Sequence, residues 1–179
     1  MKPSSAPLSV ATSRGLFVYN RSVFDRFVAR VERLPAKASR RSRGIGHLSL
    51  FDTLVHILNV HEVWIGYILP GQVRKVPALF REPGRHPKDW AGFRAYEERV
   101  WARVDGYLGT LTEKELRRTV RAPWMPGRYT VSDALLQTTF EEAHHLGEII
   151  GALWQEDRVP PDMTWIDIGR GTSRPRTRR

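Results

Sequence analysis

Two side chains that can bind a metal ion, Glu141 and His145, lie four residues apart in the last third of the sequence. On a helix, residues four apart project from the same face about one turn from each other, so both can reach one cation. The neighbouring positions on that face are Ala134, Thr138, Ile149 and Ala152. Because these side chains are small or apolar, the face is expected to point inward and to leave room for a cavity. A single pair does not by itself define a metal site.

His56 is the candidate for a third ligand. With about 100° per residue on a helix, Val60 and Val63 lie within about 40° of its direction, so the imidazole also projects from an apolar face. A lone interior histidine is more often a hydrogen-bonded core residue, because a buried polar group needs a partner. If its helix lies beside the later one, Glu141 and His145 add an oxygen and a second nitrogen. Two imidazoles and one carboxylate leave coordination positions open, as in catalytic metal sites.

Glu142 is a rival to Glu141 as the carboxylate ligand, since it lies three residues before His145. A buried acid without a cation is costly, so whichever of the two acids faces inward favours a metal. His144 points about 100° away from His145 and is expected at the surface. The sequence identifies no general base, and Glu142, His144 and Tyr67 are named as candidates without an argument from spacing.

The remaining histidines are given simpler roles. His61 projects from another side of the helix that carries His56 and is expected to pack in the interior. His47 and His86 lie in or beside loops, where spacing gives no reason to place them with the other histidines.

The 179-residue sequence contains no cysteine, which excludes disulfides, thiolate metal sites and cysteine nucleophiles. Any divalent transition metal must therefore be bound through nitrogen and oxygen, a donor set that suits zinc, manganese, iron or nickel. The length and the hydrophobic fraction of 41% are typical of a single folded domain.

The net charge of +10 is concentrated in two runs without acidic residues, 37–43 and 170–179. Both runs are interpreted as solvated, mobile segments, and weak contact with nucleic acid is the alternative. Residues 1–12 lack the apolar core of a signal peptide, and no stretch approaches the roughly 20 apolar residues of a membrane span. We therefore expect a cytoplasmic protein without membrane contact.

Apolar periodicity, capping residues and helix breakers predict the elements that position these ligands. Ser49 and Ser132 are the predicted N-caps of the second and fourth helices. Pro35 and the pair Pro70-Gly71 are expected to end the first and second helices. The four predicted helices span residues 15–34, 49–69, 89–108 and 133–156.

The segments between these helices are predicted to lack regular helix. Residues 36–46 are expected to form a loop, the proline-rich residues 70–87 a long crossover loop, and residues 117–130 a short irregular hairpin before the last helix. The fold class is therefore all-α, an up-down four-helix bundle. The crossover loop and the hairpin around Trp124 are expected to shape the entrance to a substrate site.

The chain is divided into three parts on this basis. Residues 1–12 are predicted to be a flexible leader, residues 13–165 the helical bundle, and residues 166–179 a basic flexible tail.

The order of these features resembles the DinB/YfiT-like family of damage-inducible four-helix proteins. The resemblance covers roughly residues 13–162. It rests on Tyr19-Asn20, on Leu54-Val55-His56-Ile57 followed by Glu62 and Trp64, and on the run Glu141-Glu142-Ala143-His144-His145-Leu146-Gly147-Glu148-Ile149. It implies a four-helix bundle that holds a divalent metal, often nickel, zinc or manganese, on three histidines. One histidine comes from the second helix, and two that are four residues apart come from the fourth.

His56 and His145 match two of these three positions. The third position falls on Glu141, where the family usually has histidine. This departure implies either a mixed nitrogen and oxygen site or a site that has lost affinity. The wider superfamily resembles metal-dependent transferases and isomerases that use a low-molecular-weight thiol.

Two functions follow from these observations. The first is an enzyme in which a metal on His56, Glu141 and His145 activates a water or a thiol for hydrolysis or thiol transfer on a small-molecule substrate. The second is a non-catalytic metal-binding or stress-response protein whose basic segments contact nucleic acid weakly. A homodimer is expected in either case.

Overall fold

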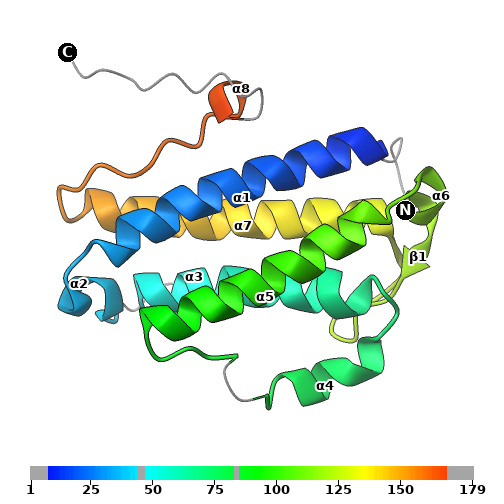
Figure 1. Ribbon diagram of the computed structural model, residues 1–179, viewed down its shortest axis with the longest axis horizontal. Coiled ribbons are helices and arrows are strands. Elements are labelled where there is room, and N and C mark those ends of the chain that lie inside the picture. The colour runs from blue at the N-terminus through cyan, green and yellow to red at the C-terminus, as the bar shows by residue number, and fades with distance from the viewer. Residues whose placement is uncertain (1–7, 44–46, 83–84, 169–179) are drawn as a thin grey trace.

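The computed structural model describes residues 8–43, 47–82 and 85–168. It is an all-α structure in which long helices lie side by side around one apolar core (Figure 1). The long elements are α1 (Val10–Glu32), α3 (Leu50–His61) continued by η1 (Glu62–Ile68), α5 (Trp90–Gly109) and α7 (Val131–Trp154). These correspond to the four predicted helices.

The packing of the long helices determines which side chains meet. Helix α3 packs against α7, η1 packs against α5, and α1 packs against α7. All four positions predicted to share the inward face of α7, Ala134, Thr138, Ile149 and Ala152, are buried. The two helices that carry His56 and His145 are therefore neighbours, which is the condition that a shared site requires.

The N-caps confirm one predicted cap and correct another. Ser49 precedes α3, and its Oγ accepts a hydrogen bond from the Asp52 backbone N–H, as predicted. Helix α7 is capped by Thr130 instead of Ser132, because Thr130 and Asp133 form a reciprocal capping box. The Ser132 Oγ is turned elsewhere and accepts a hydrogen bond from the Leu8 backbone N–H at 2.8 Å.

Two predicted loops contain helical turns. The crossover segment includes the 3₁₀ turn η2 (Val73–Lys75) and the short helix α4 (Val76–Leu79), and residues 36–46 include α2 (Ala36–Arg40). Pro77 lies in the first turn of α4, where a missing backbone N–H has no intrahelical partner to lose. The proline content was therefore a poor reason to exclude helix in the crossover segment.

The predicted hairpin before the last helix is present. Strand β1 (Thr119–Val120) pairs with β2 (Tyr129–Thr130) in antiparallel register, and Gly127 has φ of +101° in the turn between them. Short helices not predicted from the sequence are α6 (Glu113–Arg117) and α8 (Trp165–Ile168). Because β2 ends on the residue that caps α7, the hairpin is tied directly to the helix that carries His145.

The second long helix changes its winding after His61. The backbone N–H of Leu69 bonds to Trp64 O, and that of Gln72 bonds to Tyr67 O, five residues back in each case. These wide π-type turns are uncommon and often occur at functional sites. They follow directly after the α3 segment that faces α7.

The basic run 37–43 is less solvated than expected. Arg41 and Arg43 both form ion pairs with Glu156, and the Arg40 guanidinium lies 3.9 Å from the centre of the Phe51 ring. These contacts leave less free positive charge for nucleic acid. Most of the predicted leader, residues 1–7, and most of the predicted basic tail, residues 169–179, lie outside the described residues. None of the described helices has the length and apolar character needed to span a membrane.

The capping box at Thr130 predicts a measurable effect on stability. Replacing Thr130→Ala removes the side-chain acceptor, so the free energy of unfolding should fall by about 1 kcal/mol. Urea unfolding followed by circular dichroism measures this change. Thr130→Ser is the matched control, since it keeps the acceptor and should remain close to wild type. A Thr130→Ala protein as stable as Thr130→Ser would contradict the assignment of the cap.

Candidate metal centre

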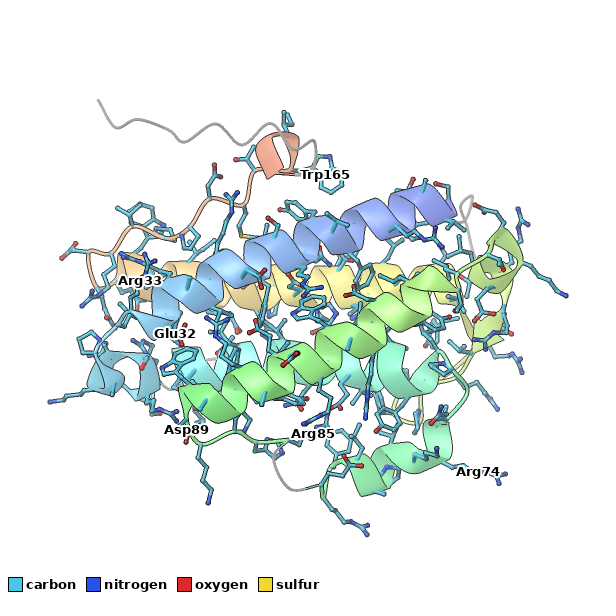
Figure 2. All side chains as sticks on the ribbon, viewed as in Figure 1. Glu32, Arg33, Arg74, Arg85, Asp89 and Trp165 are labelled. Carbon is cyan, nitrogen blue, oxygen red and sulfur yellow. The ribbon has the colours of Figure 1, made fainter. Side chains whose placement is uncertain are left out.

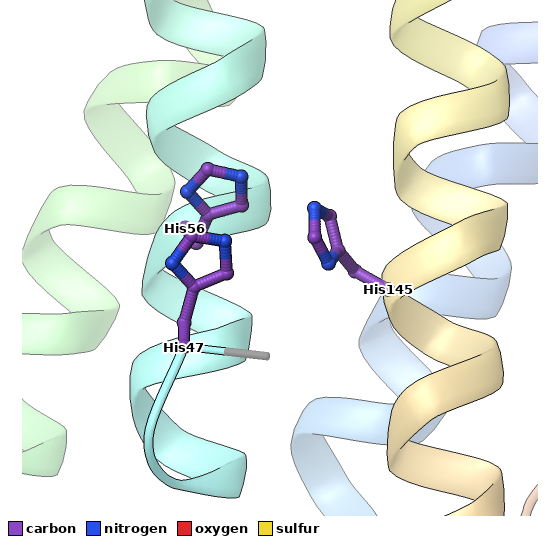
Figure 3. Close-up of side chains that lie close together, drawn as sticks. All are labelled: His47, His56 and His145. Carbon is purple, nitrogen blue, oxygen red and sulfur yellow. The ribbon is translucent and has the colours of Figure 1, made fainter. Parts of the chain in front are cut away.

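Three histidines from separate parts of the chain meet between α3 and α7. His47, His56 and His145 each offer a ring nitrogen, and these nitrogens all lie within 4.8 Å of one another. The His47 and His56 rings are stacked with centres 3.4 Å apart, and His145 reaches across from α7 nearly at right angles to His56 (Figure 3). Two of the three predicted ligand residues, His56 and His145, are thus in one cluster, and its third member is His47.

His47 was not expected in the site, and a local turn explains its position. Leu48 has φ of +74°, and the Ser49 N–H donates to His47 O at 3.0 Å. This is a γ-turn of the rare positive-φ kind, which is strained for a residue with a side chain. The turn brings His47, two residues before the α3 cap, back over the first turns of the helix, where it stacks on His56. The sequence signal was a histidine two residues before a clear N-cap, which helical periodicity does not evaluate.

A carboxylate on α7 orients His145. Its Nδ1 lies 2.9 Å from Glu148 Oε2, so a neutral His145 donates to Glu148 from Nδ1 and keeps the lone pair on Nε2. Histidine ligands in metal sites commonly donate their other ring N–H to a carboxylate in this way, which sets the tautomer and raises ligand basicity. The interaction with Glu148 thereby orients the Nε2 atom of His145, a possible metal ligand, between α7 and α3.

Glu141 lies beside the histidines and outside the group of three. Its Oε2 is 3.5 Å from His145 Nε2, and its Oε1 accepts a hydrogen bond from the Gln137 side-chain amide at 2.7 Å. The carboxylate therefore faces Nε2 of His145 while Gln137 restrains its other oxygen. Glu141 is half-buried and lines the adjoining cleft.

Glu142 faces inward, but a histidine balances it instead of a metal. Its Oε2 lies 2.7 Å from His61 Nε2, and both side chains are almost completely buried. The expectation that an inward acid at this position favours a metal is therefore wrong for Glu142. His61 is interior as predicted, and His144 is at the surface as predicted, with 67% of its side chain exposed.

The cluster favours neutral imidazoles. Burial lowers the pKa of His56 to about 3, and the neighbouring His47 and His145 contribute to the shift. Burial and the proximity of His145 also lower the pKa of His47, against the opposing effect of nearby carboxylates. Neutral imidazole is the form that binds a metal, so at neutral pH these two rings have the required protonation state.

The cluster lies on the wall of a cleft of about 660 Å³, a volume typical of small-molecule sites. His47, His56 and Glu141 line it, whereas His145 lies mostly behind them with 8% of its side chain exposed. The far wall comes from the two segments predicted to shape the entrance, and its lining residues are Phe80, Arg85, His86 and Pro87 of the crossover segment and Trp124 of the hairpin loop.

The general-base candidates lie away from this cleft. Glu142 is paired with His61, and the Tyr67 hydroxyl accepts from Arg103 beside a different cleft. His144 projects from the outer surface of α7. Of the carboxylates among the described residues, only Asp52 and Glu141 line the cleft, and Asp52 is engaged with the Ser49 cap.

The donor set fits a borderline divalent metal. Two nitrogen atoms bound to one zinc ion at about 2.1 Å lie no more than about 4.2 Å apart, so only small side-chain movements separate the observed cluster from a ligand set. Three imidazoles with one nearby carboxylate suit zinc, nickel, manganese or iron. The residues present therefore fit such an ion.

Comparison with family models identifies the family of the chain. Residues 20–149 match the family model of the DinB superfamily, a span that includes all three histidines of the cluster. No curated protein matched the chain.

The low pKa of His56 predicts a pH-dependent stability of the metal-free protein. A histidine in the unfolded chain has a pKa of about 6.5. Below that pH it binds a proton, whereas His56 in the folded protein stays unprotonated until a lower pH. The contribution of His56 to the free energy of unfolding should be fully present above pH 6.5 and should be lost as the pH decreases toward 3. The contribution is at most roughly 1.4 kcal/mol per pH unit, and smaller because the ring is partly exposed.

Thermal unfolding of chelator-treated protein between pH 5 and pH 7.5 tests this expectation. The His56→Gln variant should lose less stability on acidification than wild type. His144→Gln should retain the wild-type slope, since His144 is exposed. Equal slopes for wild type and His56→Gln would refute the assigned role of His56.

Proposed function

We propose that this chain, which belongs to the DinB superfamily, is a metal-dependent enzyme that performs thiol transfer or hydrolysis on a small molecule. In this proposal the long helices form the up-down four-helix bundle, and the metal lies between its second and fourth members. The protein is further proposed to be a cytoplasmic homodimer, with the exposed Val18 of α1 and Phe140 of α7 as candidate contact residues.

The observation that carries the proposal is the convergence of His47, His56 and His145 beside a cleft of substrate size. A structural site usually closes its coordination sphere with protein ligands, whereas a catalytic site keeps a position open. Here three imidazoles meet between α3 and α7, and the open cleft lies beside them. Glu141 is a fourth donor at the edge of the cluster, so the proposed ligand set is His47, His56 and His145 with Glu141.

A metal ion bound here would lower the pKa of a coordinated water or thiol and so supply a nucleophile at neutral pH. The side chains around the site orient the proposed ligands and limit the access of bulk water. Glu148 fixes the His145 tautomer, and Gln137 restrains Glu141. Val60 and Val63 provide an apolar wall that limits access of bulk water to the reacting groups.

The metal site is tested first by elemental analysis of protein purified without added metal. We expect close to one zinc, nickel, manganese or iron per chain, either as isolated or after loading and dialysis. His47→Ala, His56→Ala and His145→Ala should each lower metal affinity at least tenfold, because each removes a proposed ligand. Titration with a competing chromophoric chelator measures the affinity.

Two matched controls keep this test specific. His86→Ala changes a residue that lines the same cleft outside the cluster, and His144→Ala removes one member of a second group, with His145 and Glu148, whose ligand atoms also lie within 4.8 Å of one another. Both variants should bind metal like wild type if the ion occupies the cluster of His47, His56 and His145. Glu141→Gln tests whether Glu141 is a ligand. If it is, the substitution should lower metal affinity; if it is not, the affinity should stay at the wild-type value. Wild-type protein that cannot be loaded with any of the four metals would rule out the proposed function.

Thiol activation is tested independently of any substrate. A free thiol with a pKa near 8.5 is only a few per cent thiolate at pH 7. Glutathione added in excess to metal-loaded protein should show increased ultraviolet thiolate absorbance at this pH, up to one equivalent per site, and the increase should be absent with the His56→Ala variant. S-methyl glutathione is the control ligand. No increase, combined with accelerated hydrolysis of activated esters, would select hydrolysis, and failure of both would end the enzyme proposal.

A further inference from the structure

Arg85 is a buried cation that the proposed metal chemistry does not use. It belongs to the crossover segment, and its side chain, which contacts Asn59 and Glu62 of the second long helix, is only 1% exposed (Figure 2). It also lines the cleft beside the histidine cluster. A buried guanidinium requires charge and hydrogen-bond partners, so its contacts indicate what the site lacks.

Only one edge of the guanidinium is occupied. Arg85 Nε donates to Asn59 Oδ1 at 2.6 Å and lies 3.6 Å from Glu62 Oε2. The Tyr96 hydroxyl lies 2.8 Å from both of these oxygens and fixes their positions. The two terminal nitrogens, Nη1 and Nη2, are buried without a hydrogen-bond partner among the described residues. The two-nitrogen edge that binds carboxylates is therefore left free.

The charges around Arg85 do not balance. Glu62 is its acidic partner, but Arg103 also binds Glu62, with Nη1 3.0 Å from Oε1. Two guanidinium groups thus share one carboxylate, and the group carries one net positive charge. Arg103 is 36% exposed and lies beside a different cleft, so solvent screens it. The uncompensated charge at the histidine cleft is that of Arg85, and a monoanion would neutralise it.

The walls around this charge are apolar and aromatic. The Arg85 guanidinium stacks on the Phe80 ring at 4.3 Å, and Trp64 and Trp124 line the same cleft in edge-to-face contact. Phe80 is 53% exposed, so its ring is free to move away from the guanidinium toward solvent. These walls favour a ligand with an apolar body and disfavour a strongly hydrated dianion such as a phosphate monoester.

Arg85 and the histidine cluster are linked through one face of α3. Asn59, which holds Arg85, lies three residues after His56, about 4.5 Å along the helix axis. One small molecule can therefore contact both groups. The anionic end and the reacting end of such a molecule would be separated by a few bonds.

We propose that Arg85 binds the carboxylate of this protein's ligand, and that the ligand class is a small carboxylic acid with an apolar or aromatic body. The identity of this ligand as a substrate rests on the proposed function, whereas the binding itself does not require a metal. Asn59 and Glu62 are positioning residues that hold Nε beside the cleft. Because Nη1 and Nη2 are buried under the Phe80 ring, binding of the carboxylate requires that ring to move.

Isothermal titration of the full-length protein tests the proposal with matched probes. Acetate, benzoate and 3-phenylpropionate are each compared with the corresponding primary amide, in chelator-treated and metal-loaded protein. At least one of the acids should bind roughly tenfold or more tightly than its amide in both forms, because a charge-assisted pair at a buried guanidinium is worth about that factor. Arg85→Gln should remove this preference and leave amide binding unchanged.

Arg103→Gln is the matched control, since it removes a second arginine from the same glutamate without changing the histidine cleft, and it should keep the acid preference. Should Arg85→Gln fail to fold by circular dichroism, Arg85→Lys retains the charge without the two-nitrogen edge and should reduce the preference. No acid preference in any of the three pairs would overturn the proposal, as would tighter binding of phenyl phosphate than of benzoate. A preference for the acid without metal binding would contradict only the enzyme proposal. Metal binding without a preference for the acid would contradict only the proposal that Arg85 binds a carboxylate.

Discussion

The packing of α3 against α7 is the contact on which the candidate site depends, because it faces the histidines of two distant segments toward each other. His56 and His145 are far apart in sequence, and each alone is an ordinary polar residue on a mainly apolar helix. The small side chains of α7 allow the close approach, and the capping box at Thr130 defines where that helix begins. The strained turn at Leu48 then adds His47 to a pair that the helices have already assembled.

The buried polar groups differ in how completely they are paired. Glu142 and His61 form a pair whose hydrogen bond offsets part of the cost of burying an acid, but His61 Nδ1 is buried without a hydrogen-bond partner among the described residues. The Nη1 and Nη2 donors of Arg85, which lines the histidine cleft, are also buried without a hydrogen-bond partner among the described residues. Buried groups of this kind cost stability unless something else binds them. Because Arg85 lies beside the cleft, a ligand there can supply the missing partner.

Sequence periodicity predicted the helices better than the residues that complete the site. The long helices are defined by caps and apolar stripes, which depend on near neighbours in the chain, and they placed His56 and His145 correctly on inward faces. His47 depends on a single positive φ angle at Leu48, for which leucine carries no signal. The inward turn of Glu142 was foreseen, but its partner was not, because whether a buried acid meets a metal or a histidine depends on tertiary packing. The ligand role of Glu141 stays a prediction.

The second long helix presents different groups to its two neighbours. The Glu62 backbone N–H still bonds to Leu58 O, so Glu62 continues the α-helical register of α3 and lies on the same face as Asn59, three residues before it. The Tyr96 hydroxyl of α5 lies 2.8 Å from both side chains, and Arg103 of α5 also binds Glu62. His56 and Asn59 line the histidine cleft, and beyond them η1 packs mainly against α5. The helix thereby presents neutral nitrogen donors to α7 and a buried carboxylate to α5. Arg85 lies where these two faces meet, which is why a residue from a loop becomes one of the most buried side chains in the molecule.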